Sequence, residues 1–167
     1  MATYYDEITS EQTQLIKDAR VFFVATADPN LAAGPHGAGP VNLSPKGGVP
    51  LHVLDAKRVA YLDYAGSGNE TARHVTAGSP ITLMVCSFDD DAAIVRLYGH
   101  ATVSPLEGSP LAAMLLAAAP AESERPLTVR QIFDITVERT VTSCGYAVPI
   151  MEFATDRTKT LRGRRYK

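Results

Sequence analysis

The chain has 167 residues, enough for one domain with its own hydrophobic core. Hydrophobic residues make up 46% and charged residues 20%, which is typical of a globular protein and excludes a disordered chain. The net charge of −2 excludes a general attraction to nucleic acid or to an anionic membrane surface. Cys86 and Cys144 form neither a disulfide framework nor a metal-binding spacing.

Charge is distributed unevenly, because the chain begins with acidic residues and ends with basic ones. Asp6, Glu7 and Glu11 have the wrong charge for a secretory signal, and no apolar run is long enough to span a membrane. We therefore expect a cytoplasmic protein with no membrane partner. The basic tail, residues 157–167, is interpreted as a solvated or partner-packed segment, since the rest of the chain has no matching basic face for nucleic acid.

The first part of the chain predicts a helix, a buried strand and a loop. Thr9 and Ser10 are suitable caps for a short helix over 9–19. Residues 21–27 are rich in Val and Phe, which is typical of a buried strand. Gly and Pro recur through 28–40, so this segment is expected to be a loop or a long hairpin connection.

The rest of the chain predicts further strands separated by turns, with two helices inserted. The strands are expected at 41–44, 51–54, 59–64, 81–88, 94–103 and 131–141. One helix should follow the turn after residue 64 and end at Gly78, and an alanine-rich helix should cover 108–119. Cys86 lies in an apolar run and is expected in the core.

About seven short strands, linked mostly by tight turns, indicate a mainly β protein of the α+β class. The helices are inserted without the regular β-α-β spacing of a doubly wound parallel sheet. The pattern instead favours a small antiparallel barrel with Greek-key connections and a few peripheral helices, built as one domain over residues 1–167.

The segment 61–75 combines an apolar strand, a turn with two glycines and the expected start of a helix. If Gly66 and Gly68 adopt positive φ, successive backbone N–H groups point into one concavity that can hold an anion. Ser67 and Glu70 fit a capping box that would start the helix here. A dinucleotide fingerprint would need a third glycine, and no Walker sequence follows. Taken alone, the turn is either an anion site or an ordinary strand-to-helix junction.

Four segments of the chain carry a resemblance to a known family. They are Val-Asn-Leu-Ser-Pro-Lys-Gly at 41–47, the strand and turn at 59–71, the strand 81–88 with Arg-Leu-Tyr-Gly-His-Ala at 96–101, and Ser-Cys-Gly-Tyr-Ala-Val-Pro at 143–149. In this order they resemble the pyridoxamine 5′-phosphate oxidase-like family. The resemblance implies a split β-barrel that forms a homodimer and binds FMN in clefts between the two subunits, with a small molecule as substrate.

The resemblance also implies which residues hold the FMN phosphate. In that family a basic residue near the end of an early strand does so, together with the turn after a later strand. Lys46 matches the first place, and Ser67, Gly68 and Asn69 match the second, with Thr71 close behind and Arg73 as a neighbour. The best-known oxidase members carry Arg and Lys in this turn, where this chain has Gly68 and Asn69. Their loss predicts weaker retention of FMN and admits the deazaflavin coenzyme as an alternative cofactor.

Two strands supply the remaining predicted cofactor contacts. Asn42 and Ser44 share one face of their strand, and in the family's geometry this face can reach the flavin ring. The alternative interpretation of this face is the polar outer side of an edge strand. Leu43, through the backbone of the same strand, and Asp63 complete the predicted cofactor-binding set.

Other side chains leave two interpretations open. Arg96 lies in the middle of an apolar strand and needs a partner, either Glu138 in a salt bridge or the cofactor of the neighbouring subunit. Tyr146 either lines the substrate side or packs in the dimer. The histidines have no partner at metal spacing, so no metal site is expected.

The leading functional hypothesis is an FMN-dependent oxidoreductase of unknown substrate. No Ser/His/Asp order, activated cysteine or paired carboxylate stands out, so any chemistry would be the cofactor's own. The alternative is a barrel that binds flavin, deazaflavin or haem as a carrier or sensor without turnover. A third hypothesis is a dimeric scaffold that has lost its ligand.

Overall fold

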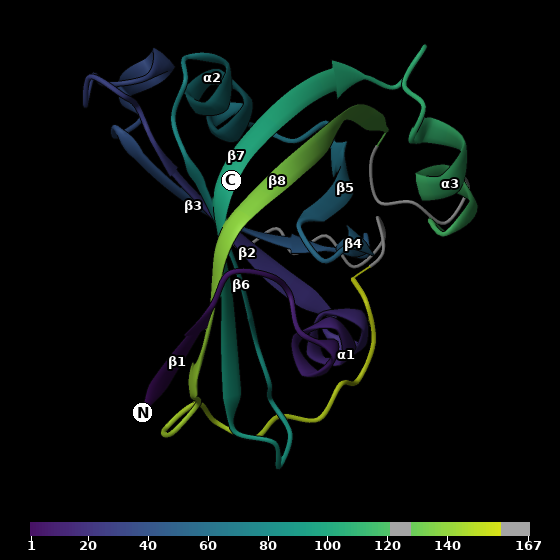
Figure 1. Ribbon diagram of the computed structural model, residues 1–167. Coiled ribbons are helices and arrows are strands. Elements are labelled where there is room, and N and C mark those ends of the chain that lie inside the picture. The colour runs from purple at the N-terminus through teal and green to yellow at the C-terminus, as the bar shows by residue number, and fades with distance from the viewer. Residues whose placement is uncertain (121–127, 158–167) are drawn as a thin grey trace.

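The computed structural model describes residues 1–120 and 128–157. Within them, one antiparallel sheet of eight strands has the order β3-β2-β6-β7-β8-β5-β4, with β1 paired to β8 (Figure 1). The strands are β1 (Ala2–Tyr5), β2 (Val21–Ala27), β3 (Val41–Gly47), β4 (His52–Asp55), β5 (Arg58–Tyr64), β6 (Ile81–Cys86), β7 (Ala93–Pro105) and β8 (Val129–Cys144). The helices are α1 (Ser10–Asp18), α2 (Glu70–Thr76), α3 (Ala112–Ala117) and the 3-10 turn η1 (Pro35–Gly37).

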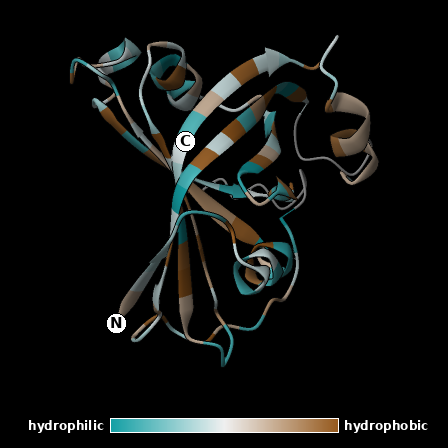
Figure 2. Cartoon of the chain, in the orientation of Figure 1, coloured by the Kyte–Doolittle hydropathy of each residue, from teal (hydrophilic) through white to brown (hydrophobic). Residues whose placement is uncertain are grey.

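The two longest strands, β7 and β8, run side by side through the molecule (Figure 1). They pair from Ala93 opposite Cys144 to Pro105 opposite Gln131, so they connect the β3-β2-β6 part of the sheet to the β5-β4 part. Hydrophobic and hydrophilic residues alternate along both strands (Figure 2). This alternation follows from the pleat, because successive side chains point to opposite faces and one face packs on the core.

A β-bulge at Gly99 interrupts the pairing of β7 with β8. The register shifts between Tyr98 and Gly99, which leaves Glu138 as the extra residue on β8. A Cβ atom at Gly99 would collide with the backbone carbonyl oxygen of Thr136. Glycine is therefore needed here because the two backbones approach closely, and not because of a positive φ.

Side chains bridge the opening of the barrel, where the sheet is not closed by hydrogen bonds. Lys46 of β3 forms an ion pair with Asp63 of β5, Nζ to Oδ1 2.9 Å. The Tyr64 hydroxyl donates to the carbonyl oxygen of Gly48 at 3.1 Å. The end strand β3 and the turn after it therefore meet β5, the strand next to the other end, through polar contacts that lie at the candidate site described below.

An aromatic cluster lies in the core between the two parts of the sheet. Tyr61 of β5 stacks on Phe133 of β8 with ring centroids 4.9 Å apart, and Phe22 of β2 meets Tyr61 edge-on at 5.2 Å. All three side chains are buried. Such pairs stabilise a core beyond the area they bury. None of the helices in the described part of the chain is long and apolar enough to cross a membrane.

The predicted fold class is confirmed: the chain is mainly β, with an antiparallel split barrel and peripheral helices. The helix predicted at 9–19 is α1, and Thr9 forms a capping box with Gln12. The predicted list of strands lacked β1, because residues 2–5 are mostly exposed and show no apolar alternation. This strand forms only by pairing with the end of β8. From residue 158 onward, the basic tail lies outside the described residues.

Two further expectations are corrected by the structure. The alanine-rich helix α3 spans Ala112–Ala117 instead of 108–119, because Gly108 has a φ of +78° and Pro110 follows it. Cys86 is half-buried and does not belong to the core cluster. Its side chain points to the face of β6 opposite to that of Val85, which is buried.

Candidate functional site

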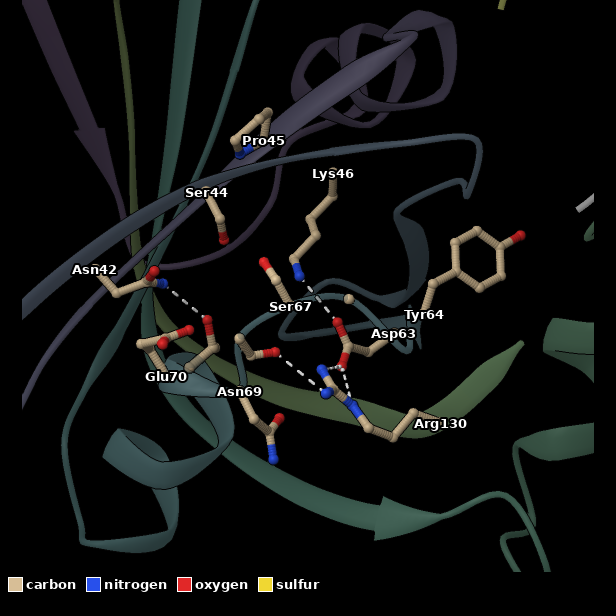
Figure 3. A pocket seen from close by; sticks show the side chains of 13 residues that line it. Asn42, Ser44, Pro45, Lys46, Asp63, Tyr64, Ser67, Asn69, Glu70 and Arg130 are labelled. Carbon is tan, nitrogen blue, oxygen red and sulfur yellow. Dashed lines mark hydrogen bonds and ion pairs between the residues drawn. The ribbon is translucent and has the colours of Figure 1, made fainter. Parts of the chain in front are cut away.

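A cavity of about 430 Å³ lies at the opening of the barrel (Figure 3). Its walls are β3, the end of β5, the turn 65–69, the start of α2 and the start of β8. Eight of the nine predicted cofactor-binding residues line it: Asn42, Ser44, Lys46, Asp63, Ser67, Gly68, Asn69 and Thr71. The barrel thus brings together segments that the sequence separates.

The pleat of β3 decides which of its residues face the cavity. Asn42, Ser44 and Lys46 lie opposite Thr26, Val24 and Phe22 of β2, and share their face of the sheet. Leu43 points to the other face and is 68% exposed. The prediction of Leu43 as a cofactor contact therefore receives no support from its side chain, because residues one position apart on a strand face opposite sides.

Asp63 is the centre of the polar network in the cavity (Figure 3). Its carboxylate is only 2% exposed, and Oδ1 accepts a hydrogen bond from Lys46 Nζ at 2.9 Å. Oδ2 accepts from Arg130 Nη2 at 2.7 Å, from Arg130 Nε at 3.2 Å and from Gln131 Nε2 at 2.9 Å. Burial alone would raise the pKa of Asp63, but the hydrogen bonds from Lys46 and Arg130 outweigh it and hold this pKa below its usual range. Asp63 is therefore ionised at neutral pH.

Arg130 is the cavity residue that the sequence did not indicate. It precedes the strand predicted at 131–141, in a segment without a recognisable motif. In the structure β8 begins at Val129, and its pairing of Gln131 with Asp63 places Arg130 beside the turn. Arg130 Nη1 donates to the carbonyl oxygen of Gly68 at 3.1 Å. One guanidinium thus holds both the buried carboxylate and the turn.

The turn 65–69 differs from the expected conformation, in which Gly66 and Gly68 have positive φ and backbone N–H groups form a concavity for an anion. Neither Gly66 nor Gly68 has a positive φ. The predicted capping box of Ser67 and Glu70 is absent as well, because α2 begins at Glu70 with Asn69 as its N-cap and no side-chain cap. A Cβ atom at Gly68 would instead collide with the Glu70 carboxylate, so Gly68 provides the space that this carboxylate occupies. Arg73, the expected neighbour of the phosphate, lies 3.7 Å from the Glu70 carboxylate.

Amide and hydroxyl side chains hold the turn and α2 in place from two strands. Asn42 Nδ2 of β3 donates to Thr71 Oγ1 at 3.0 Å, and Gln131 Nε2 of β8 donates to Asn69 Oδ1 at 2.9 Å. These bonds attach the start of α2 to both sides of the cavity. Asn42 and Thr71 therefore have a structural role whether or not a ligand is present.

The two other side chains with open interpretations, Arg96 and Tyr146, lie elsewhere. The expected salt bridge of Arg96 with Glu138 is wrong: Arg96 Nη1 donates to Ser143 Oγ at 3.2 Å. The bulge sets Glu138 out of the ladder, where its carboxylate lies 3.6 Å from His100 Nε2. Tyr146 is 89% exposed and does not line the cavity. Within the described residues, no three His, Cys, Asp or Glu side chains form a group that could hold a metal ion.

Comparison with known proteins decides the family. A family model described as pyridoxamine 5′-phosphate oxidase matches residues 8–144. This chain belongs to the pyridoxamine 5′-phosphate oxidase family. The match contains β2 to β8 and every residue of the cavity.

Members of this family and proteins of the same fold resemble the chain over most of its length. The Aspergillus flavus pyridoxamine 5′-phosphate oxidase family protein ustO is 28% identical over 161 residues, which cover 93% of this chain and 59% of ustO. A candidate pyridoxamine 5′-phosphate oxidase from Lactobacillus delbrueckii has a TM-score of 0.59 and 23% identity over 81% of this chain and 94% of its own. An FMN-binding protein from Syntrophomonas wolfei has a TM-score of 0.55 and 12% identity over 77% of this chain and 86% of its own.

The donor set of the cavity fits a polar ligand with an anionic group. Lys46 and Arg130 supply cationic N–H donors, and Ser44, Ser67 and Thr71 supply hydroxyls. No histidine or cysteine lines the described part of the cavity. Since Asp63 is fully hydrogen-bonded and ionised, it is unsuited to act as a general acid at neutral pH. The residues present are equipped to bind and orient a ligand, and not to act as a nucleophile.

Proposed function

We propose that this protein binds a flavin-type cofactor, FMN, in the cavity at the opening of the barrel and uses it to oxidise or reduce a small molecule. The observation that carries the proposal is the meeting of Lys46, Arg130 and the turn 65–69 around one cavity, in a chain of the pyridoxamine 5′-phosphate oxidase family. The Syntrophomonas wolfei protein, which shares the fold, is itself an FMN-binding protein.

The residues of the cavity divide into two groups under this proposal. Lys46 and Arg130 would hold the phosphate by charge-assisted hydrogen bonds, with the Ser67 hydroxyl beside them. Asn42 and Ser44, on the cavity face of β3, would orient the ring by hydrogen bonds. Bound FMN supplies hydride and electron transfer at its ring. The protein's part is to bind the cofactor, fix its orientation and restrict access of water.

A carrier without turnover is the second candidate function, and one observation favours it. The described lining of the cavity holds no histidine or cysteine, and its buried carboxylate is already neutralised by Lys46 and Arg130. Such a site would retain a flavin or the deazaflavin coenzyme without contributing a proton donor of its own.

We propose a homodimer in which a second copy covers the outer face of β3. Val41 and Leu43 expose apolar side chains there, at 66% and 68%, on a strand at the end of the sheet. Pro45 continues the same face, opposite Phe23 of β2. Because β3 also forms one wall of the cavity, a second copy on this face would lie next to the cofactor site.

The visible absorption spectrum of the purified protein, before and after addition of FMN, tests the flavoprotein proposal. We expect flavin bands that shift on binding and flavin fluorescence that is quenched. A colourless protein that neither shifts nor quenches added FMN would rule the proposal out. Anaerobic addition of a nicotinamide donor then separates the two functions: bleaching of the bound flavin supports the enzyme, and a flavin that stays oxidised with every donor supports the carrier.

A further inference from the structure

The charges that line the cavity cancel within the part of the chain that the structure describes. Lys46 and Arg130 are the cations, and Asp63 and Glu70 are the carboxylates, so the net charge of the lining is zero. We infer that the cavity selects a flavin-type ligand whose phosphate carries one negative charge, such as a phosphodiester, over a phosphomonoester dianion. This inference rests on the proposed function and specifies its ligand.

Asp63 reduces the positive charge that Lys46 and Arg130 present to a ligand. Its carboxylate lies 2.9 Å from Lys46 Nζ and 2.7 Å from Arg130 Nη2, so both cations are already paired before any ligand enters. The carboxylate is buried, whereas the Lys46 and Arg130 side chains are 21% and 27% exposed. Together the three groups carry one net positive charge, and all three line the cavity.

Glu70 places a second negative charge on the cavity wall. Figure 3 shows its side chain between those of Asn42 and Asn69. Its carboxylate occupies the space beside Gly68, where a Cβ atom would collide with it. The turn beside the cavity thus holds a glycine and a neighbouring carboxylate at this point. Arg73 lies 3.7 Å from this carboxylate and is 37% exposed, so it compensates Glu70 only in part.

The charge balance decides which phosphate is preferred. The lining has no net charge, and Arg73, which lies outside it, offsets only part of one added negative charge. A dianion would therefore leave more negative charge uncompensated than a monoanion and would lose more hydration on entering the cavity. Electrostatic interactions in a partly enclosed cavity are stronger than in bulk water, so this difference in charge has a measurable effect on affinity. The ring and the hydroxyl contacts are common to both kinds of ligand and do not discriminate.

Two sources provide a singly charged phosphate, and the experiment distinguishes them. One is a phosphodiester, which carries one negative charge between pH 5.5 and pH 8 because two of its oxygens are esterified. The other is a phosphomonoester below its second pKa of about 6. The probes are riboflavin, FMN and riboflavin 4′,5′-cyclic phosphate, which carry no phosphate, a monoester and a diester. Dissociation constants are measured by flavin fluorescence between pH 5.5 and 8, each relative to riboflavin at the same pH.

We expect FMN to lose affinity, relative to riboflavin, by about threefold to tenfold between pH 5.5 and pH 8. The dissociation constant of the cyclic diester, relative to that of riboflavin, should stay constant over this pH range. The cyclic diester should also bind more tightly than FMN at pH 8. The charged groups that line the cavity are Lys46 of β3, Asp63 of β5, Glu70 of α2 and Arg130 of β8, and Arg73 of α2 lies behind Glu70 outside the lining. His74 of α2 is buried and forms a hydrogen bond with Thr26. The cyclic diester, whose charge does not change between pH 5.5 and pH 8, is the control for any titration of the protein that acts on the phosphate.

The Glu70→Gln variant tests the role of the second carboxylate at constant shape. It should raise the affinity for FMN at pH 8 more than that for the cyclic diester, and so reduce the difference between them. Glu138→Gln, an exposed change on β8 outside the cavity, is the matched control and should leave both affinities unchanged.

The outcomes separate this inference from the proposed function. If FMN binds more tightly at pH 8 than at pH 5.5 relative to riboflavin, or if Glu70→Gln leaves the preference unchanged, the charge-selection inference is wrong while the flavoprotein proposal stands. If none of the three probes binds at any pH, the proposed function fails and the inference fails with it.

Discussion

Asp63 is a buried carboxylate between two cations that reach it from different strands. Lys46 arrives from β3 and Arg130 from β8, and Gln131 completes the hydrogen bonds of Oδ2. Removing one partner of a buried ion pair leaves a charge without compensation, which costs far more than removing an exposed pair. This difference between buried and exposed pairs allows the network to be tested without any ligand.

Arg130→Ala is expected to lower the free energy of unfolding by about 3 kcal/mol, because it leaves Asp63 with Lys46 as its remaining cation and detaches Gly68 from β8. Urea denaturation followed by circular dichroism measures the loss. Arg58→Ala is the control: its ion pair with Asp134 is half-exposed, so its loss should cost at most about 1 kcal/mol. Equal losses in the two variants would contradict the buried network.

The pH dependence of stability provides a second test of Asp63. Its folded pKa is lowered, so its ionised form contributes stability that is fully present above the unfolded pKa of about 3.9 and is lost as pH falls through the folded pKa. Asp63→Asn removes this contribution. We expect the variant to be less stable than the wild type at pH 7 and the difference to shrink as pH falls from about 5 towards 3.

The measurement is the urea midpoint of wild type and variant at a series of pH values. Asp91→Asn, in the exposed turn between β6 and β7, serves as the control for removing one carboxylate. A constant difference between Asp63→Asn and the wild type from pH 7 to pH 3 would show that Asp63 does not titrate with a lowered pKa.

At the scale of elements, two glycines differ in what surrounds them. The space beside Gly99 is filled by the backbone of β8 at Thr136, which cannot move without breaking the pairing of β7 with β8. The space beside Gly68 is filled by the end of the Glu70 side chain, which can rotate away. Replacing glycine by alanine therefore has different consequences at Gly99 in the strand and at Gly68 in the turn.

Gly99→Ala should destabilise the protein by about 2 kcal/mol or more, because the added methyl group forces the two longest strands apart. Gly68→Ala should cost less than about 1 kcal/mol, since only a flexible side chain is displaced. Thermal unfolding of both variants measures the effects, with Gly39→Ala, which meets open space, as the control. A Gly99→Ala protein as stable as the control would contradict the close approach at the bulge.

At the scale of the whole molecule, β3 has two faces with different roles. Asn42, Ser44 and Lys46 face the cavity, while Val41 and Leu43 expose an apolar surface at the end of the sheet. An exposed apolar edge strand is a surface that proteins normally cover. The proposed dimer across β3 would cover it and would place the second subunit beside the cavity.

Leu43→Glu should convert the proposed dimer to a monomer, because it places a charge in the apolar surface that the second copy covers. Sedimentation velocity of wild type and variant measures the change. Leu31→Glu is the matched control, since Leu31 is also 68% exposed but lies in the loop between β2 and β3. A wild type that sediments as a monomer at micromolar concentration would contradict the dimer, and a variant that remains dimeric would place its interface elsewhere.

Much of the fold was predictable from local patterns. Val21 to Ala27 is a run of strand-forming residues, and Gly78 marks the end of α2, so the position and type of such elements follow from propensity and turn chemistry. β1 was not predictable, because its residues are exposed and it exists only through pairing with β8. The bulge at Gly99 was not predictable either, because it depends on the close approach of the β7 and β8 backbones, which no local sequence pattern indicates.

For the candidate site, the sequence by itself pointed to two segments, the end of β3 with Lys46 and the turn after β5, and the structure places both at one cavity. Only the tertiary structure decided the charge of that site. Arg130 joins it because β8 pairs with β5 in a register that sets Gln131 opposite Asp63, although 68 positions separate these two residues in the chain. Electrostatic pairing depends on distances through space, so the pairing of Arg130 with Asp63 could not be predicted from the sequence. Strands and turns form largely from neighbouring residues, so the position of the turn after β5 could be predicted.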